Sequence, residues 1–194
     1  MQVGNQVHRG RSWRVHDVAG DSTLLDVWRL PVAGSDAPGR DFAAFVAMHE
    51  AMLRAPGGKG AAGFLFRVRE RLGQWLSLDE PLDLSIPGCA EKSIRERLPE
   101  DQRADPATAG PFRLVYALPD ERLYETSNRT VHALMHLGWV RDEGAAYPEM
   151  AVYVKERGTF GRAYMLAIAP FRHLVVYPSL MRMARQRWER AAGG

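Results

Sequence analysis

TFGRAYMLAIAPFRHLVVYPSLMRMARQRWER, residues 159–190, is the longest apolar-rich stretch of the chain. Its first half carries apolar residues at helical steps of three and four, with further apolar residues between them. The stretch therefore predicts a long helix that is apolar nearly all round and has to be buried. Pro170 and Pro178 each lack a backbone donor and clash with the preceding turn, so we expect kinks or breaks there.

The second half of this stretch is cationic. A helix crossing a membrane needs about 20 apolar residues, and Arg172, His173 and the two prolines interrupt the segment, so a true span is disfavoured. Contact of the basic end with an anionic membrane surface stays open as a subordinate alternative. The basic residues around Trp188 are Arg182, Arg185, Arg187 and Arg190.

Length and composition indicate one globular domain. The chain has 194 residues, of which 46% are hydrophobic and 25% charged. Its net charge is only +3, and its arginines are interleaved with acidic residues, which disfavours nucleic-acid binding. The single cysteine, Cys89, cannot form an intramolecular disulfide, and the N-terminus lacks the apolar core of a signal peptide. We expect a cytoplasmic protein with a loose arm over residues 1–11 and one domain over 12–190.

The remaining pattern predicts two short N-terminal strands, two amphipathic helices and then an antiparallel meander. A meander needs an element that covers one of its faces, and only the C-terminal helix is long and apolar enough. The fold class is therefore α+β, with a curved sheet gripping a long kinked helix. The expected strands are 12–18, 24–30, 112–118, 121–128, 129–140 and 150–156, and the expected helices before the meander are 41–54 and 61–76.

The segment 129–140 shows the clearest alternation. Its odd positions from Val131 to Trp139 are all apolar and should face the long helix. His132 and His136 then lie on the outer face, where a solvated or a cross-strand role is expected. Four residues of a strand span about 13 Å, which is too far for two ligands of one metal ion, so no metal site is predicted.

Three local motifs have plain structural interpretations. The glycine cluster around Lys59 lacks the Lys-Ser/Thr pair and the preceding buried strand of a phosphate-binding loop, so we interpret it as a flexible loop. Cys89 has no local histidine to activate it and is interpreted as a small turn or core residue. Ser93 and Glu96 have the spacing of a capping box for a short helix that ends at Leu98.

Arg172 and His173 are the candidate catalytic residues, because they stand together in an otherwise apolar helix. A buried arginine needs a carboxylate, for which Glu125 and Asp17 are candidates, or else it points to solvent. The first interpretation is therefore a structural ion pair, or a helix cap after the Pro170 kink. In the alternative interpretation, the two residues form the polar end of a cavity together with a tyrosine and orient a carboxylate or an enolate. Enzymatic side chains would point into an enclosed pocket, whereas those of a plain binding protein or a structural protein would be exposed or held in ion pairs.

Two functions from different classes are compatible with these features. The leading hypothesis is a binding module that holds a small apolar or aromatic molecule between the sheet and the C-terminal helix, with no cofactor. The alternative is a cyclase-like or hydrolase-like enzyme that uses the same cavity. The residues expected to line the cavity are Tyr116, Glu125, Met135, Trp139, Tyr153, Tyr164, Ile168 and Arg172.

Several segments resemble a bacterial family known as domain of unknown function 2867. They are SNRTVHALMHLGW (127–139), MAVYVK (150–155), FGRAYMLAIAPFRHLVVYPSLM (160–181) and SIPGCAEKSIRERLP (85–99), of which the PFRH element is the most specific. The resemblance covers most of the chain from about Trp13. It implies a branch of the helix-grip (SRPBCC) superfamily, which includes START domains and pollen-allergen-type proteins, and hence an apolar cavity. Family members fused behind a nicotinamide-dependent reductase imply such a partner, but the family supplies no catalytic residues.

Overall fold

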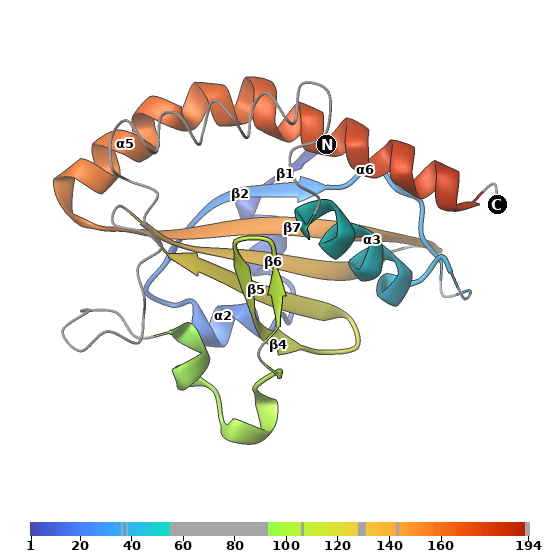
Figure 1. The fold of residues 1–194 in the computed structure, drawn as a ribbon, viewed down its shortest axis with the longest axis horizontal. Helices are drawn as coiled ribbons and strands as arrows, with labels where there is room; N and C mark the ends of the chain where they lie inside the picture. The colour runs from blue at the N-terminus through green and yellow to red at the C-terminus, as the bar shows by residue number, and fades with distance from the viewer. Residues whose placement is uncertain are drawn as a thin grey trace.

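The fold is α+β and is built on one seven-stranded antiparallel sheet with the order β1-β2-β7-β6-β5-β4-β3 (Figure 1). The computed structural model describes residues 1–35, 37, 39–54, 93–105, 107–127, 131–142 and 144–192. A long C-terminal helix crosses the sheet, so the predicted helix-grip architecture is confirmed. The strands are β1 (Gln2–Val3), β2 (Thr23–Arg29), β3 (Thr108–Ala109), β4 (Phe112–Ala117), β5 (Glu121–Ser127), β6 (Val131–Asp142) and β7 (Ala145–Glu156).

Strands β4 to β7 form the meander that the alternating pattern predicts. β6 pairs with β7 along its whole length, and β5 pairs with the first part of β6. β7 starts at Ala145, earlier than the predicted Met150. The turn before it contains Gly144 with φ of +82°, a left-handed conformation that glycine adopts without strain, so the two strands are joined by a tight connection.

The long helix has three parts. These are α5 (Gly158–Phe171), a π-helical segment η3 (Arg172–Val176) and α6 (Tyr177–Ala192). The helix therefore becomes irregular shortly after Pro170, one of the two prolines at which a kink or break was predicted. The helix continues through Pro178, and the wider π-helical turn before it gives the proline ring room beside the preceding carbonyl.

A large core lies between this helix and the sheet. The odd positions of β6 face the helix as predicted, and Leu137 and Trp139 pack in one cluster with Tyr177 and Trp188 of α6. The helix α3 (Phe42–Arg54) lies on the same face and contributes Phe45. The indole Nε1 of Trp188 donates a hydrogen bond to the carbonyl of Ala33 at 2.9 Å, which fixes α6 to the segment after β2.

The first half of the helix is less buried than its composition suggests. Leu166 is 70% exposed and Leu174 is 76% exposed. The expectation that this half is enclosed on all sides is therefore wrong. Among the described side chains of α5, Met165 and Ile168 pack on a small cluster formed with Val131 and Val154 of the sheet.

The other face of the sheet is covered as well, which the meander pattern did not predict. The short helices α2 (Val15–Val18) and η1 (Ile94–Arg97) pack there against Tyr116, Leu134 and Tyr153. Figure 1 shows these elements on the side of the sheet opposite the long helix. Residues 12–18, expected as an edge strand, contain α2 instead. The 3-10 helix η1 is preceded by Ser93, whose hydroxyl accepts a hydrogen bond from the Arg95 amide, as the capping pattern suggested.

Residues 1–11 make specific contacts with the sheet. β1 pairs with β2 at the edge of the sheet, and α1 (Asn5–Arg9) follows at once. His8 of α1 is fully buried. The division of the chain into an arm and a domain over 12–190 stays a prediction, and the predicted helix 61–76 lies outside the described residues.

Candidate functional site

A β-bulge in β2 positions the first candidate site. The register between β2 and β7 shifts between Leu24 and Asp26. Leu24 and Val27 both belong to the core on the face away from the helix, whereas Leu25 and Asp26 both face the helix. The extra residue therefore turns Asp26 toward the long helix, where strict alternation would have pointed it away.

Three side chains of the helix converge on this buried carboxylate. Tyr177 donates its hydroxyl to Oδ2 of Asp26 at 2.8 Å. Nε of Arg172 lies 3.1 Å from Oδ2, and Nε2 of His173 lies 3.2 Å from Oδ1. A π-helical turn has more than four residues, so it brings Arg172 and Tyr177, five positions apart, close to one side of the helix. We call these four residues the Asp26 cluster.

The Asp26 cluster settles how Arg172 is paired. Neither Glu125 nor Asp17 is its partner, because Glu125 lies on the opposite face of the sheet and Asp17 pairs with Arg14. Burial raises the pKa of Tyr177, and the neighbouring Asp26 raises it further, so the tyrosine stays protonated and donates. Arg172 and His173 are both held in ion pairs with Asp26, as expected of a plain binding protein or a structural protein.

A half-buried apolar surface lies next to the Asp26 cluster. On β6 and β7, the helix-facing pairs under α6 are large, as in Leu137 opposite Met150. Toward α5 they become small, with Ala133 opposite Val154. The half-buried apolar residues at this end are Leu25, Ala133, Val152 and Ile168.

A second polar group lies on the other face of the sheet, under the N-terminal segment. Nδ1 of His8 donates to Oε1 of Glu149 at 2.6 Å, and its Nε2 lies 2.9 Å from the hydroxyl of Tyr153. That hydroxyl is 3.3 Å from Nδ1 of His16. His8 and Glu149 have no exposed side-chain surface. We call these four residues the His8 network; it joins α1 and α2 to β7.

Glu121 forms a further polar contact on this face. It accepts hydrogen bonds from the Tyr116 hydroxyl at 2.5 Å and from the Arg14 amide at 2.9 Å. A bulge between Leu114 and Tyr116 turns Tyr116 to this side. The fully buried His136 lies 3.7 Å from Oε1 of Glu121, and neither of its ring nitrogens makes a hydrogen bond in the described part of the chain. Burial lowers the pKa of His136, although Glu121 acts in the opposite direction.

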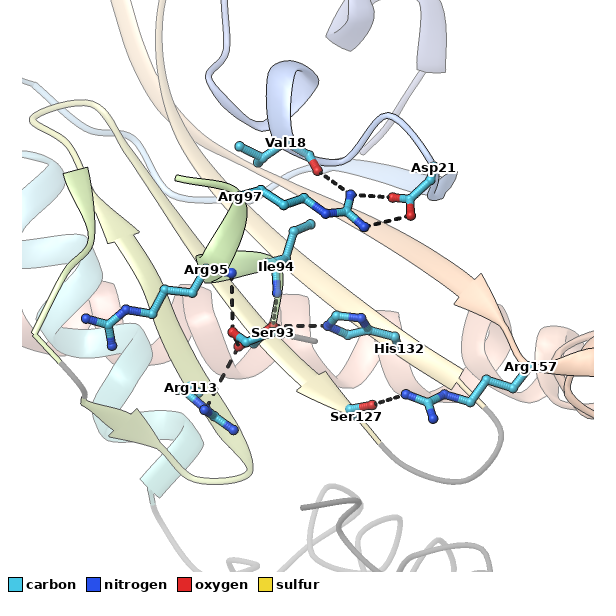
Figure 2. Close-up of polar contacts among 11 residues, drawn as sticks. Val18, Asp21, Ser93, Ile94, Arg95, Arg97, Arg113, Ser127, His132 and Arg157 are labelled. Carbon is cyan, nitrogen blue, oxygen red and sulfur yellow. Dashed lines mark hydrogen bonds and ion pairs between the residues drawn. The ribbon is translucent and has the colours of Figure 1, made fainter. Parts of the chain in front are cut away.

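Ser93, Ile94 and His132 lie close together at the turn that starts η1 (Figure 2), and the carboxylate of Glu125 anchors this turn. It accepts hydrogen bonds from the Ser93 hydroxyl, from the Ile94 amide at 3.1 Å and from Nε2 of His132 at 3.1 Å. Burial acts to raise the pKa of Glu125, but these hydrogen bonds outweigh it and the pKa lies below its ordinary value. The carboxylate stands between the serine and the histidine, so the histidine cannot take the serine proton directly. The group is suited to holding η1 on the sheet.

His132 and His136 are therefore buried, and their predicted solvated role is wrong. Their cross-strand role is confirmed, because each lies on β6 diagonally opposite a glutamate of β5. Among the residues that the structure describes, no group of three His, Cys, Asp or Glu side chains is arranged to hold a metal ion.

The structure separates the residues that the sequence grouped as ligand contacts. Met135, Trp139, Ile168 and Arg172 face the space between the sheet and the helix. Tyr116, Glu125 and Tyr153 lie on the opposite face and cannot share a site with them. The side chain of Tyr164 lies outside the described part, as do Lys59 and Cys89.

Sequence reasoning missed Asp26, His8 and Glu149. Asp26 was hidden because its orientation depends on a bulge, which alternation does not reveal. His8 and Glu149 are far apart in the chain and meet only through tertiary packing. One signal was present, since β5, β6 and β7 each carry two polar side chains flanking an apolar residue at steps of two. These are Glu121-Leu123-Glu125, His132-Leu134-His136 and Glu149-Ala151-Tyr153.

Comparisons with known proteins identify a family. A family model described as "Protein of unknown function (DUF2867)" matches residues 18–179. This range contains β2, the Asp26 cluster and the buried glutamates Glu121, Glu125 and Glu149. Residues 1–17, with His8 and His16, precede it. Neither the curated proteins nor the solved structures gave a significant match.

Proposed function

Because the chain belongs to the family Protein of unknown function (DUF2867), which carries no assigned activity, we propose a function from the geometry alone: the protein binds a small apolar or aromatic molecule with one polar end. The molecule would lie between α5 and the sheet, beside the Asp26 cluster. The membership of the wider helix-grip superfamily stays a prediction.

The observation that carries this proposal is the half-buried apolar surface under α5. Ligand sites are largely apolar with a few polar groups that fix orientation. Leu25, Ala133, Val152 and Ile168 supply the apolar part. Arg172 supplies the polar end, because its Nη1 is buried and has no hydrogen-bond partner within the described chain. His173 is 35% exposed at the side chain and lies at the outer edge of the same cluster.

The ion pairs with Asp26 favour binding over catalysis. Asp26 holds Arg172 in place and contacts His173 through Nε2, which leaves only Nδ1 of His173 to exchange a proton with a substrate. The enzyme alternative would require that nitrogen to reach the substrate. A nicotinamide-dependent reductase as partner remains an expectation from family resemblance.

Fluorescence titration with anilinonaphthalene sulfonate, an aromatic anion, tests the proposal. Ala133→Leu should fill the space under α5 and weaken binding of the dye about tenfold or more, because the isobutyl side chain that replaces the methyl group blocks the apolar contact. Ala117→Leu, at an exposed alanine of β4, is the matched control and should bind as the unchanged protein does. Equal binding by all three proteins would contradict the proposal.

Native mass spectrometry of protein purified from its own host gives an independent check. A retained small molecule that is lost in Ala133→Leu and kept in Ala117→Leu would support the proposed site. If both variants retained the molecule, its binding site would lie elsewhere in the protein.

A further inference from the structure

The outward side of α5 and η3 is apolar, which is the reverse of an ordinary surface helix. Its members recur at offsets of three, four, seven and eleven, the spacing of one helix face. Leu166 and Leu174 are more than two-thirds exposed, and the other members are exposed too. We call Ala163, Leu166, Ala167, Pro170 and Leu174 the α5 stripe.

The outward side of α6 is cationic. α6 contains four arginines and one glutamate. Arg182, Arg185 and Arg190 are exposed, and Arg187 is half-buried. Arg185 pairs with Glu189 at 3.5 Å, and within the described part of the chain Arg182, Arg187 and Arg190 have no carboxylate partner. We call these four residues the α6 arginines.

The two surfaces lie end to end on one continuous helix. Figure 1 shows that this helix forms the outermost layer on its side of the sheet. A flat partner can therefore touch the α5 stripe and the α6 arginines together. No helix among the described residues is both long and apolar enough to cross a membrane, so the partner surface would be met from one side.

We propose that the long C-terminal helix docks in the plane of an anionic lipid bilayer surface, with Leu166 and Leu174 inserted among the lipids and the α6 arginines on their headgroups. Interfacial helices combine a buried apolar side with basic residues that contact anionic lipids. This surface faces away from the proposed ligand site and does not depend on it.

Charge complementarity favours a bilayer over a second copy of this chain. Two copies that paired through their α5 stripes would have to place the α6 arginines near an acidic surface to neutralise them. At the other end of this helix, the acidic residue Glu156 already pairs with Arg162 at 3.4 Å. An anionic bilayer neutralises the arginines directly and accepts the leucines at the same time.

Co-sedimentation with vesicles tests the proposal. The full chain should bind vesicles of mixed phosphatidylcholine and phosphatidylglycerol and should bind pure phosphatidylcholine vesicles much more weakly. Leu166→Ser with Leu174→Ser should lower the partition coefficient at least about tenfold, because both exposed side chains lose their apolar contact. Leu118→Ser, at an exposed leucine outside the helix, is the control and should bind normally.

A charge-matched pair tests the electrostatic part. Arg182→Gln with Arg190→Gln should lower the partition coefficient on the anionic vesicles roughly 30-fold, since each basic residue near the surface contributes a similar share of the binding free energy. Arg9→Gln with Arg95→Gln removes the same net charge from α1 and η1, on the opposite face of the sheet, and should leave most of the binding intact.

Two outcomes would overturn the proposal. The first is the absence of any preference for anionic vesicles. The second is concentration-dependent dimerisation in sedimentation velocity that Leu174→Ser abolishes, which would assign the stripe to a second copy of the chain. All substituted side chains except that of the half-buried Arg95 are exposed, so unchanged circular dichroism and thermal unfolding are expected and keep the comparison valid.

Discussion

Nε of Arg172 in the long helix lies 3.1 Å from Oδ2 of Asp26 in β2. Both residues owe this position to an irregular backbone. The π-helical segment rotates Arg172 toward the sheet, and the bulge in β2 turns Asp26 toward the helix. Two local irregularities therefore create one buried polar contact at the edge of an apolar surface.

Replacing the carboxylate of this contact should destabilise the protein. Asp26→Ala leaves Arg172 and the Tyr177 hydroxyl without their acceptor in a buried position. We expect the free energy of unfolding to fall by about 3 kcal/mol, because removal of one partner leaves an uncompensated charge. Urea denaturation measures this change. Asp17→Ala, at an exposed aspartate paired with Arg14, is the control and should cost less than about 1 kcal/mol.

His8→Ala should loosen the N-terminal segment. The substitution leaves the buried carboxylate of Glu149 without its closest donor and removes the ring that contacts Tyr153. A loss of about 3 kcal/mol is expected, together with faster hydrogen exchange in α1 and β1. An unchanged exchange rate in β1 would show that the His8 network does not hold the segment in place.

Gly138→Ala tests the packing of Trp13 on the far face of the sheet. A Cβ atom at position 138 would lie 2.9 Å from Cζ2 of Trp13, so the indole has to move. We expect a loss of roughly 1–3 kcal/mol and an altered tryptophan fluorescence spectrum. Gly20→Ala is the control, because a Cβ at that glycine meets no atom within 4 Å. Similar effects of the two substitutions would contradict this account of Trp13.

The buried His49 of α3 should make stability depend on pH. Burial lowers the pKa of His49 from 6.5 to about 4, while Glu50 acts in the opposite direction. The unfolded chain therefore binds a proton on this residue at a higher pH than the folded protein does. The contribution of His49 to the free energy of unfolding is fully present above pH 6.5. It is lost as the pH falls toward 4, by roughly 3 kcal/mol in total.

His49→Met, a substitution of similar volume, should flatten the stability curve in this window. The measurement is the free energy of unfolding of both proteins from pH 7 to pH 4.5 in buffers of equal ionic strength. Curves that stay parallel would mean that His49 is not the group responsible.

Much of this fold is legible in the sequence because its strands and helices have regular periods. The alternation of β6 places Leu137 and Trp139 against the helix, and the cap at Asp41, whose Oδ1 accepts from the Ala44 amide at 2.9 Å, starts α3 where the pattern predicts. The sequence pattern did not predict that short helices cover the second face of the sheet. Residues 12–18 alternate like a strand, and only tertiary contacts of Val15 and Val18 with the sheet favour a short helix there.

The candidate site was legible only in part. Arg172 stands out in an apolar helix, and its need for a carboxylate follows from elementary electrostatics. The identity of that carboxylate does not follow, because a bulge reverses the direction of Asp26. The tyrosines at 116 and 153 were grouped with Arg172 by residue type, and the structure separates them by the thickness of the sheet.

Methyl NMR during a titration with anilinonaphthalene sulfonate tests the central claim most directly. The account predicts that the methyl signals of Leu25, Ala133, Val152 and Ile168 shift as the dye binds, while those of Leu123 and Leu134 on the opposite face stay unchanged. Shifts confined to the opposite face, or binding that leaves the methyl signal of Ala133 in place, would contradict a ligand site between α5 and the sheet.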